Sequence, residues 1–299
     1  MAASAAHEAM VEQIVANAQR TPEERPSAKQ LAASREAEIA TFPPEPDDVV
    51  VADETIGGVP CVVVRARDAA STGTVVFVHG GGYIWMRART HLAVACALVR
   101  RSGCRCVSVD YRRAPEHPYP APVEDLLAVY GALLGDGEPS TRIAFAGDSA
   151  GGGLVLAGLV AARDAGMPLP AAGVSVSPWT DLTVTGASAD TADDPIVSGD
   201  GLRMMADVYL DGADPTSPTA SPLYADLRGL PPLLVQVGTR ESLLDDARRV
   251  VERARDHGVD VTLHEFDDVI HMWIVIGPDL PESQEAFAEA GTFIRARLG

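Results

Sequence analysis

One serine of this chain lies where nucleophilic chemistry is expected. A run typical of a buried strand, residues 142–146, leads into the sequence GDSAG at 147–151, and an alanine-rich helical stretch follows directly. Glycine two residues before and two residues after the serine allows a very tight turn, because a larger side chain would crowd it. Such a turn, a nucleophile elbow, points the hydroxyl away from both strand and helix. We therefore predict that Ser149 is a nucleophile.

A second glycine-rich turn is expected to supply hydrogen-bond donors to the same reaction. Residues 74–78 resemble another buried strand, and the sequence HGGGY follows at 79–83. Successive glycines at a strand end let backbone N–H groups approach a ligand closely. The N-terminus of the helix after Ser149 would add a further donor. We expect His79 to brace this loop by hydrogen bonding. The predicted oxyanion-hole donors are the backbone N–H groups of Gly81, Gly82 and Ala150.

Phosphate binding is the main alternative for glycine-rich turns of this kind. A P-loop requires a Gly-Lys-Ser/Thr ending, and the only lysine of the chain is Lys29. A dinucleotide-binding fingerprint requires Gly-x-Gly-x-x-Gly, which the sequence GDSAGGG does not contain. Neither phosphate motif is therefore present around Ser149.

Four further segments extend the pattern along the chain. They are DYRRAPEHPYPAPVEDLLAVY, VSPWTDLT, SPLYADLRGLPPLLVQVGTRE and DDVIHMW. With the two glycine motifs, they resemble the hormone-sensitive-lipase-like family of α/β-hydrolase carboxylesterases from about residue 74 to the C-terminus. The family usually has leucine where this chain has Arg113. The resemblance implies an α/β-hydrolase fold, a serine–acid–histidine triad and hydrolysis of carboxylic esters.

The general base must be a histidine that follows both the serine and the acid, since this fold keeps that order along the chain. Three histidines meet this condition: His257, His264 and His271. His257 precedes Gly258 and is expected to cap the end of a helix. His264 is expected on the solvated face of a strand. His271 lies in a loop before the last helix, at the position of the family's histidine, and is the predicted base.

The acid is Glu241 or Asp245. The family most often has aspartate at the first acidic position after the strand PPLLVQVG, where this chain has Glu241, and a second aspartate four residues later. Glutamate can also orient the imidazole and stabilise its protonated form. Its extra methylene group then requires a shift of the loop. Asp245 and Asp246 are expected to be favourable charges at a helix N-terminus. Glu241 is therefore the predicted acid, with Asp245 as the alternative.

The elements that must position these residues alternate along the chain. Strands are expected near 48–56, 59–66, 74–78, 104–109, 142–146, 172–177, 232–237 and 259–266. Helices are expected near 90–101, 121–134, 150–164, 242–256 and 282–297. This alternation predicts an α/β fold, with a mostly parallel twisted sheet flanked by helices.

Helical segments outside this alternation are expected to form a cap over the site. Residues 1–45 contain two predicted helices, 5–19 and 27–40. Residues 46–299 form the predicted catalytic domain, with a cap insertion at about 185–212. Aromatic side chains and methionines near the oxyanion loop and in the insertion could bind the substrate, although each could equally be ordinary core. The predicted substrate-binding residues are Tyr83, Trp85, Met204, Met205 and Tyr209.

Composition limits the partners. The chain has 24 basic and 42 acidic residues and a formal net charge of −18, which argues against nucleic acid or an anionic membrane as partner. Neither the four cysteines nor the acidic pairs, such as Asp193-Asp194, have the spacing of a metal motif, so we expect no metal and no cofactor. We expect these acidic pairs at the surface or at caps. We expect no signal peptide and no membrane span, because Glu8 and Glu12 interrupt the apolar residues near the N-terminus. Cytoplasmic localisation is therefore expected.

These observations predict a carboxylesterase. We expect it to hydrolyse small, short- to medium-chain acyl esters through an acyl-enzyme, with a small-molecule ester as its partner; association into a homodimer is left open. A lactone or aryl-amide hydrolase with the same triad is the alternative. A non-catalytic ligand receptor of the same fold is a more remote alternative, since both Ser149 and His271 are retained.

Overall fold

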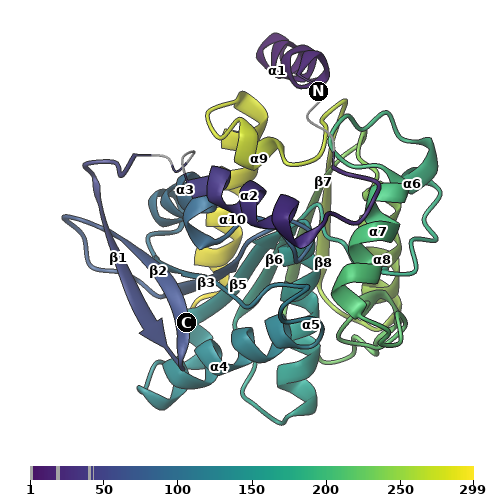
Figure 1. The fold of residues 1–299 in the computed structure, drawn as a ribbon. Coiled ribbons are helices and arrows are strands. Elements are labelled where there is room, and N and C mark those ends of the chain that lie inside the picture. The colour runs from purple at the N-terminus through teal and green to yellow at the C-terminus, as the bar shows by residue number, and fades with distance from the viewer. Residues whose placement is uncertain (1–2, 18–20, 40–41, 43) are drawn as a thin grey trace.

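A single eight-stranded sheet forms the centre of the part of the chain that the computed structural model describes, residues 3–17, 21–39, 42 and 44–299 (Figure 1). The strand order is β1-β2-β4-β3-β5-β6-β7-β8. The strands are β1 (Val49–Ile56), β2 (Val59–Ala66), β3 (Thr74–Val78), β4 (Arg105–Val109), β5 (Ile143–Asp148), β6 (Ala172–Val176), β7 (Leu233–Gly238) and β8 (Val261–Phe266).

Most of this sheet is parallel. Strand β3 pairs in parallel with both β4 and β5, and the parallel pairing continues through β6, β7 and β8. The antiparallel pairs of this sheet are β1 with β2 and β2 with β4. Strands β3, β5, β6 and β7 are buried along their whole length, as expected for strands covered on both faces. The predicted fold class, α/β with a mostly parallel sheet, is confirmed.

Helices cover both faces of the sheet. Helices α4 and α5 pack on one face and α3 and α10 on the other (Figure 1). The helices are α1 (Ala5–Ala16), α2 (Ala28–Ile39), α3 (Leu92–Ser102), α4 (Ala121–Gly135), α5 (Ala150–Asp164), α6 (Ser188–Thr191), α7 (Gly199–Leu210), α8 (Leu244–Asp256), α9 (Trp273–Ile276) and α10 (Pro281–Arg297). The boundaries of the predicted strands and of the flanking helices agree with these to within two residues. Residues 18, 19 and 40 of the predicted N-terminal helices lie outside the described residues.

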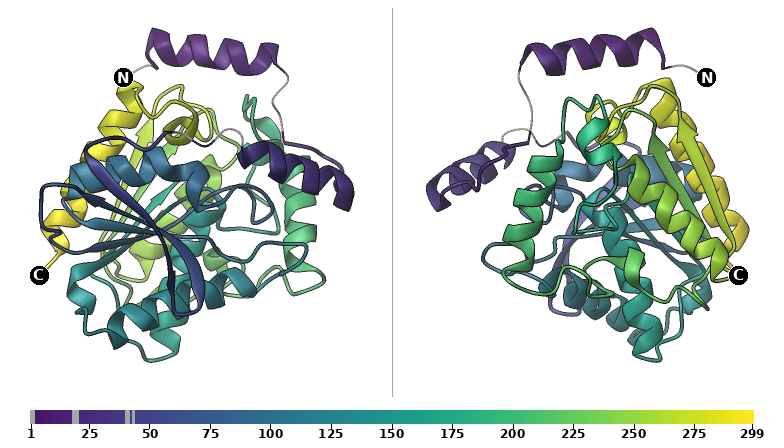
Figure 2. Two further views of the ribbon diagram at one scale, coloured as in Figure 1. Left: turned by 60° about the vertical axis from the view of Figure 1, so that its left-hand side comes forward. Right: turned by 90° about the vertical axis from the view of Figure 1, so that its right-hand side faces the viewer.

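Helices α1 and α2 lie outside the sheet and its covering layers, with α1 at the top of both views in Figure 2. Ser4 is the N-cap residue of helix α1, and its hydroxyl accepts a hydrogen bond from the N–H of His7, a common way to satisfy a helix N-terminus. Its buried residues are His7, Val11 and Ile14. The insertion at 185–212 contains the two helices α6 and α7. The division into a cap, 1–45, and a catalytic domain, 46–299, stays a prediction.

Candidate active site

Ser149 lies on the turn between β5 and α5. Its backbone angles are φ 55° and ψ −122°, a strained conformation for a residue with a side chain. A Cβ atom on Gly151 would lie 2.0 Å from the carbonyl oxygen of Val78, and one on Gly147 would lie 2.5 Å from that of Gly151. Both flanking positions therefore require glycine, and the predicted tight turn is present.

The structure brings the three predicted triad residues together. The Nε2 atom of His271 lies 2.9 Å from the hydroxyl oxygen of Ser149, and its Nδ1 atom lies 2.8 Å from Oε2 of Glu241. All three side chains are buried. His271 stands in the loop between β8 and α9, and Glu241 in the loop between β7 and α8. With the proton on Nδ1 donated to Glu241, Nε2 is free to accept the proton of Ser149.

Two donors hold the second oxygen of Glu241. Oε1 accepts hydrogen bonds from the hydroxyl of Ser177 and from the backbone N–H of Gly238, each at 2.7 Å. Ser177 follows β6, is buried, and has φ 48°. Because these contacts occupy Oε1, the carboxylate presents Oε2 to His271. The sequence analysis missed Ser177, although the segment VSPWTDLT contains it.

The electrostatic surroundings favour protonation of His271. Burial opposes a charge on its imidazole, but the hydrogen bond and the charge of Glu241, with Asp194 and Asp148 adding to them, raise the pKa of His271 above its ordinary value. Asp194 is itself buried, which raises the pKa of its carboxyl. Its carboxylate accepts backbone N–H groups of Ile196 and Ser242, each at 3.0 Å. Asp194 is therefore buried and hydrogen-bonded to two backbone N–H groups, whereas its neighbour in the acidic pair, Asp193, is exposed.

The other candidate acids have different partners. Asp245 and Asp246 lie in the first turn of α8, as expected. Asp245 accepts the N–H of Ser188 at 3.0 Å. Asp246 is buried and accepts the N–H groups of Thr180 and Asp181 at 2.8 and 2.9 Å. The structure therefore places Glu241, and not Asp245, against the imidazole of His271.

The other two candidate histidines lie away from the serine. His257 is the C-cap residue of α8, as predicted, and its Nδ1 accepts the N–H of Leu227 at 2.9 Å. The expectation that His264 is solvated is wrong in part. Its side chain is only 33% exposed, because Nδ1 pairs with Glu289 of α10 at 2.8 Å and the ring stacks on Phe266.

The predicted oxyanion loop, HGGGY at 79–83, turns beside Ser149 and continues to Met86. Gly81 and Gly82 have φ 106° and 60°, values that glycine adopts without strain. The carbonyl oxygen of Gly81 accepts the N–H groups of Ile84 and Trp85 at 3.1 and 2.9 Å. A Cβ atom on Gly82 would lie 2.1 Å from the sulfur of Met205, so a side chain there would collide with α7. Gly81 and Gly82 line the same cavity as Ser149, and Ala150, the third predicted donor, is the first residue of α5.

Two side chains brace this loop from behind. Burial lowers the pKa of His79 well below its ordinary value, so the imidazole is neutral. Its Nδ1 lies 2.7 Å from the carbonyl oxygen of Gly80, and its ring stacks on Tyr111. Asp148, next to the nucleophile, accepts the N–H of Gly80 at 3.1 Å. The expected bracing role of His79 agrees with these contacts, and Asp148 links the loop to the elbow.

A cavity of about 630 Å³ opens onto Ser149 and His271. Of the five predicted substrate-binding residues, Trp85 and Met205 line it. Sequence analysis missed lining residues that come from the α1–α2 connection, from α2, from the insertion and from α9. They include Thr21, Pro22, Ser34, Val197, Val275 and Ile276.

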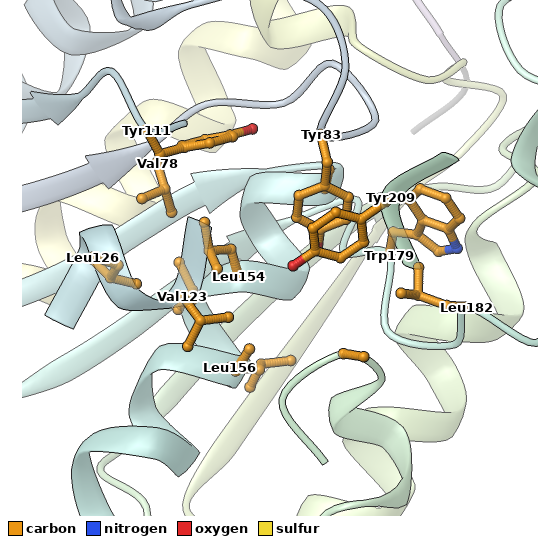
Figure 3. Packing of buried hydrophobic residues seen from close by; sticks show 14 of the residues in the cluster. Val78, Tyr83, Tyr111, Val123, Leu126, Leu154, Leu156, Trp179, Leu182 and Tyr209 are labelled. Carbon is orange, nitrogen blue, oxygen red and sulfur yellow. The ribbon is translucent and has the colours of Figure 1, made fainter. Parts of the chain in front are cut away.

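The other three predicted substrate-binding residues are core residues. Tyr83 and Tyr209 stack on each other, with ring centroids 3.8 Å apart, beside Trp179 (Figure 3). Met204 is buried in the same core cluster. Successive residues of a helix point about 100° apart, so when Met205 faces the cavity Met204 points elsewhere. The prediction of Tyr83, Met204 and Tyr209 as pocket residues is not supported by their positions.

The described residues contain neither a metal-site cluster nor a membrane-spanning helix. Among them, no group of three or more histidine, cysteine, aspartate or glutamate side chains is arranged to hold a metal ion. No helix in the same residues is both long and apolar enough to cross a membrane.

The sheet order and the serine on its tight turn define an α/β-hydrolase. A family model described as the alpha/beta hydrolase fold matches residues 75–275. An acetyl-hydrolase of Streptomyces hygroscopicus is 45% identical over 257 residues, covering 85% of this chain and 84% of the relative. A carboxylesterase of Mycobacterium tuberculosis, NlhH, is 34% identical over 280 residues, covering 86% of each.

A solved structure gives the same result. The crystal structure of an esterase from the bacterial hormone-sensitive lipase family has a TM-score of 0.92 and 44% sequence identity, with 100% of both chains covered. The chain belongs to the hormone-sensitive-lipase-like family of α/β-hydrolases. It is an enzyme, a serine hydrolase that acts on carboxylic ester bonds.

Proposed function

We propose that this enzyme hydrolyses small, short- to medium-chain acyl esters with the triad Ser149, His271 and Glu241. The observation that carries the proposal is the hydrogen-bonded chain from Ser149 through His271 to Glu241, which opens onto a cavity of about 630 Å³. Pockets for small molecules commonly have about 300 to 1,000 Å³. The named acetyl-hydrolase and carboxylesterase relatives support an ester substrate.

The proposed reaction has two stages. His271 takes the proton of Ser149 as the hydroxyl oxygen attacks the ester carbonyl, while Glu241 fixes the imidazole tautomer. Backbone N–H groups of Gly81, Gly82 and Ala150 stabilise the tetrahedral oxyanion. The protonated His271 then gives its proton to the departing alcohol, which leaves an acyl-enzyme on Ser149. Water attacks this ester by the same steps and releases the acid.

A panel of p-nitrophenyl esters from acetate through octanoate to palmitate tests the substrate class. We expect kcat/KM to be highest for the short and medium chains and roughly tenfold or more lower for palmitate, because the cavity that side chains of α2, α7 and α9 line measures only about 630 Å³. Lactones and anilides measured alongside provide the comparison. A preference for either of these, or for palmitate, would contradict the proposed specificity.

The two hydrogen bonds to Oε1 of Glu241 give a separate prediction. Ser177→Ala removes one of the two donors to Oε1, so the carboxylate can rotate away from His271. We expect kcat to fall about tenfold, in line with the loss of a hydrogen bond to a charged group, with KM changed less than about twofold.

Ser175→Ala is the matched control for this change. Ser175 is equally buried, lies two residues earlier, within β6, and donates to the carbonyl oxygen of Gly152 at 2.9 Å. Removal of its hydroxyl leaves Glu241 untouched, so kcat should stay close to that of the parent. Equal losses in both variants would mean that Ser177 stabilises the fold and does not orient the acid.

A further inference from the structure

One arginine of α2 is bound to the main chain beside the oxyanion loop. The guanidinium of Arg35 donates from Nε and Nη2 to the carbonyl oxygen of Ile84, at 3.0 and 2.7 Å. Nη2 also donates to the carbonyl oxygen of Ala114 at 2.6 Å. Nη1 binds both carboxylate oxygens of Glu116 at 2.9 Å. The planar fork of an arginine suits this combination of three acceptors.

A second residue on the same helix face holds the same loop. Glu38 follows Arg35 by three residues, so the two side chains project from one face of α2. Its Oε1 accepts the backbone N–H of Met86 at 2.9 Å. Nη1 of Arg113 donates to the carbonyl oxygen of Met86 and lies 4.0 Å from Oε2 of Glu38. Helix α2 therefore binds the loop at two backbone groups, the carbonyl oxygen of Ile84 and the N–H of Met86.

These contacts bear directly on the predicted oxyanion donors. The carbonyl oxygen of Gly81 accepts the N–H groups of Ile84 and Trp85, so the position of Ile84 fixes the turn that contains Gly81 and Gly82. Ala114 belongs to the same arrangement, because its N–H donates to the carbonyl oxygen of Tyr83 at 3.0 Å. Ile84 is fully buried, and a buried carbonyl group without a donor is unfavourable.

We propose that Arg35 is a positioning residue through which the seated helix α2 sets the geometry of the oxyanion loop. The oxyanion hole is then complete only while α2 lies on the loop, and the cap helix acts on the chemical step as well as on the pocket. This inference rests on the proposed ester hydrolysis. It implies that even an acetate ester, whose acyl group is too short to fill the cavity, depends on α2.

Arg35→Met is the decisive variant, because methionine keeps an unbranched stem and removes every donor. We expect kcat for p-nitrophenyl acetate to fall about tenfold with KM within about twofold of the parent, since oxyanion contacts act in the transition state. The affinity for a trifluoromethyl ketone, which mimics the tetrahedral oxyanion, should fall by a similar factor. Arg35→Lys should not restore kcat, because one ammonium group cannot serve all three acceptors.

Arg203→Met is the matched control. Arg203 lies on α7, also outside the sheet, and forms exposed ion pairs with Asp190 and Asp200. Its hydrogen bonds go to these two aspartates and not to the oxyanion loop, so its replacement should leave acetate turnover unchanged. If kcat of Arg35→Met fell only for longer esters, α2 would act only as part of the pocket wall, and the proposal would be overturned. Acetate turnover within twofold of the parent would overturn it as well.

Hydrogen–deuterium exchange gives a readout that does not require ester hydrolysis. In Arg35→Met, amides of the peptide that covers residues 79–90 should exchange faster than in the parent, while those of β5 should not change. Suppose that exchange is faster in Arg35→Met but the parent cleaves no ester. The inference that Arg35 positions the loop would then stand, and only the proposed function would be contradicted. Unchanged exchange in an active esterase would count against the role of Arg35 alone.

Discussion

Ser149→Ala is expected to remove nearly all turnover, with a loss of about 10⁶-fold in kcat, as for other serine triads. Without the hydroxyl no acyl-enzyme can form, and only the oxyanion donors and substrate binding remain to accelerate the reaction. The fold should survive. Alanine keeps the Cβ atom that the backbone at φ 55° already accommodates, and the backbone N–H and C=O of residue 149 keep their partners at Val176 and Trp179.

Steady-state kinetics on p-nitrophenyl butyrate and a thermal unfolding curve measure the two effects separately. An organophosphate should label Ser149 in the parent and nothing in Ser149→Ala, as detected by peptide mass spectrometry. Ser102→Ala serves as the control, since this buried hydroxyl lies in α3 and donates to Leu98 at 2.7 Å. Labelling of another serine, or substantial turnover by Ser149→Ala, would show that the nucleophile has been misassigned.

The sheet was predictable because its strands are short apolar runs that alternate with helices of ordinary length. Burial of β3 and β5 on both faces requires continuous apolar sequence, and that sequence marks the strands clearly. The elbow was predictable for a different reason. Only glycine fits at residues 147 and 151, where a Cβ atom would collide with backbone. A steric requirement of this kind leaves a visible pattern in the sequence.

The pocket walls were much less predictable. Residue type indicates that Tyr83, Trp85 and Met205 are large, but not whether each side chain faces the cavity or the core. Part of the cavity lining comes from Thr21 and Ser34, which lie more than a hundred residues before Ser149. Neither residue belongs to a recognisable motif. Helix α9 has four residues, too few for a hydrophobic period to be recognised. These features depend on tertiary contacts, which local sequence does not record.

The polar anchors of the site show the same limit. Arg35 acts through hydrogen bonds to Ile84, Ala114 and Glu116, which lie 49 or more residues away in sequence. Ser177 acts through one hydrogen bond to Glu241, 64 residues away. An arginine on a short helix with few large apolar residues is typical of an exposed surface, and a serine after a strand is typical of a turn. Only the folded structure places the first beside the oxyanion loop and the second against Glu241.

Glu241→Gln is expected to lower kcat by about 10⁴-fold. Ser177 and Gly238 both donate to Oε1 of the glutamate, so the amide oxygen of glutamine has to occupy that position. The amide NH₂ group then faces Nδ1 of His271 in place of Oε2. Because NH₂ can only donate there, the imidazole proton moves to Nε2, and His271 can no longer accept the proton of Ser149. Asp245→Asn should cost far less, since Asp245 contacts Ser188 and not the imidazole.

The pH profile of these variants provides an independent test. In the parent, Glu241 helps to raise the pKa of His271 above 6.5 despite burial. The base works only when it is neutral, so kcat/KM should fall as the pH drops through this raised pKa. Glutamine carries no charge, and burial then dominates, so the acid limb of the residual activity should move to lower pH. In Asp245→Asn the limb should stay in place. A 10⁴-fold loss with a displaced limb in Asp245→Asn, and a nearly unchanged Glu241→Gln, would move the acid to Asp245.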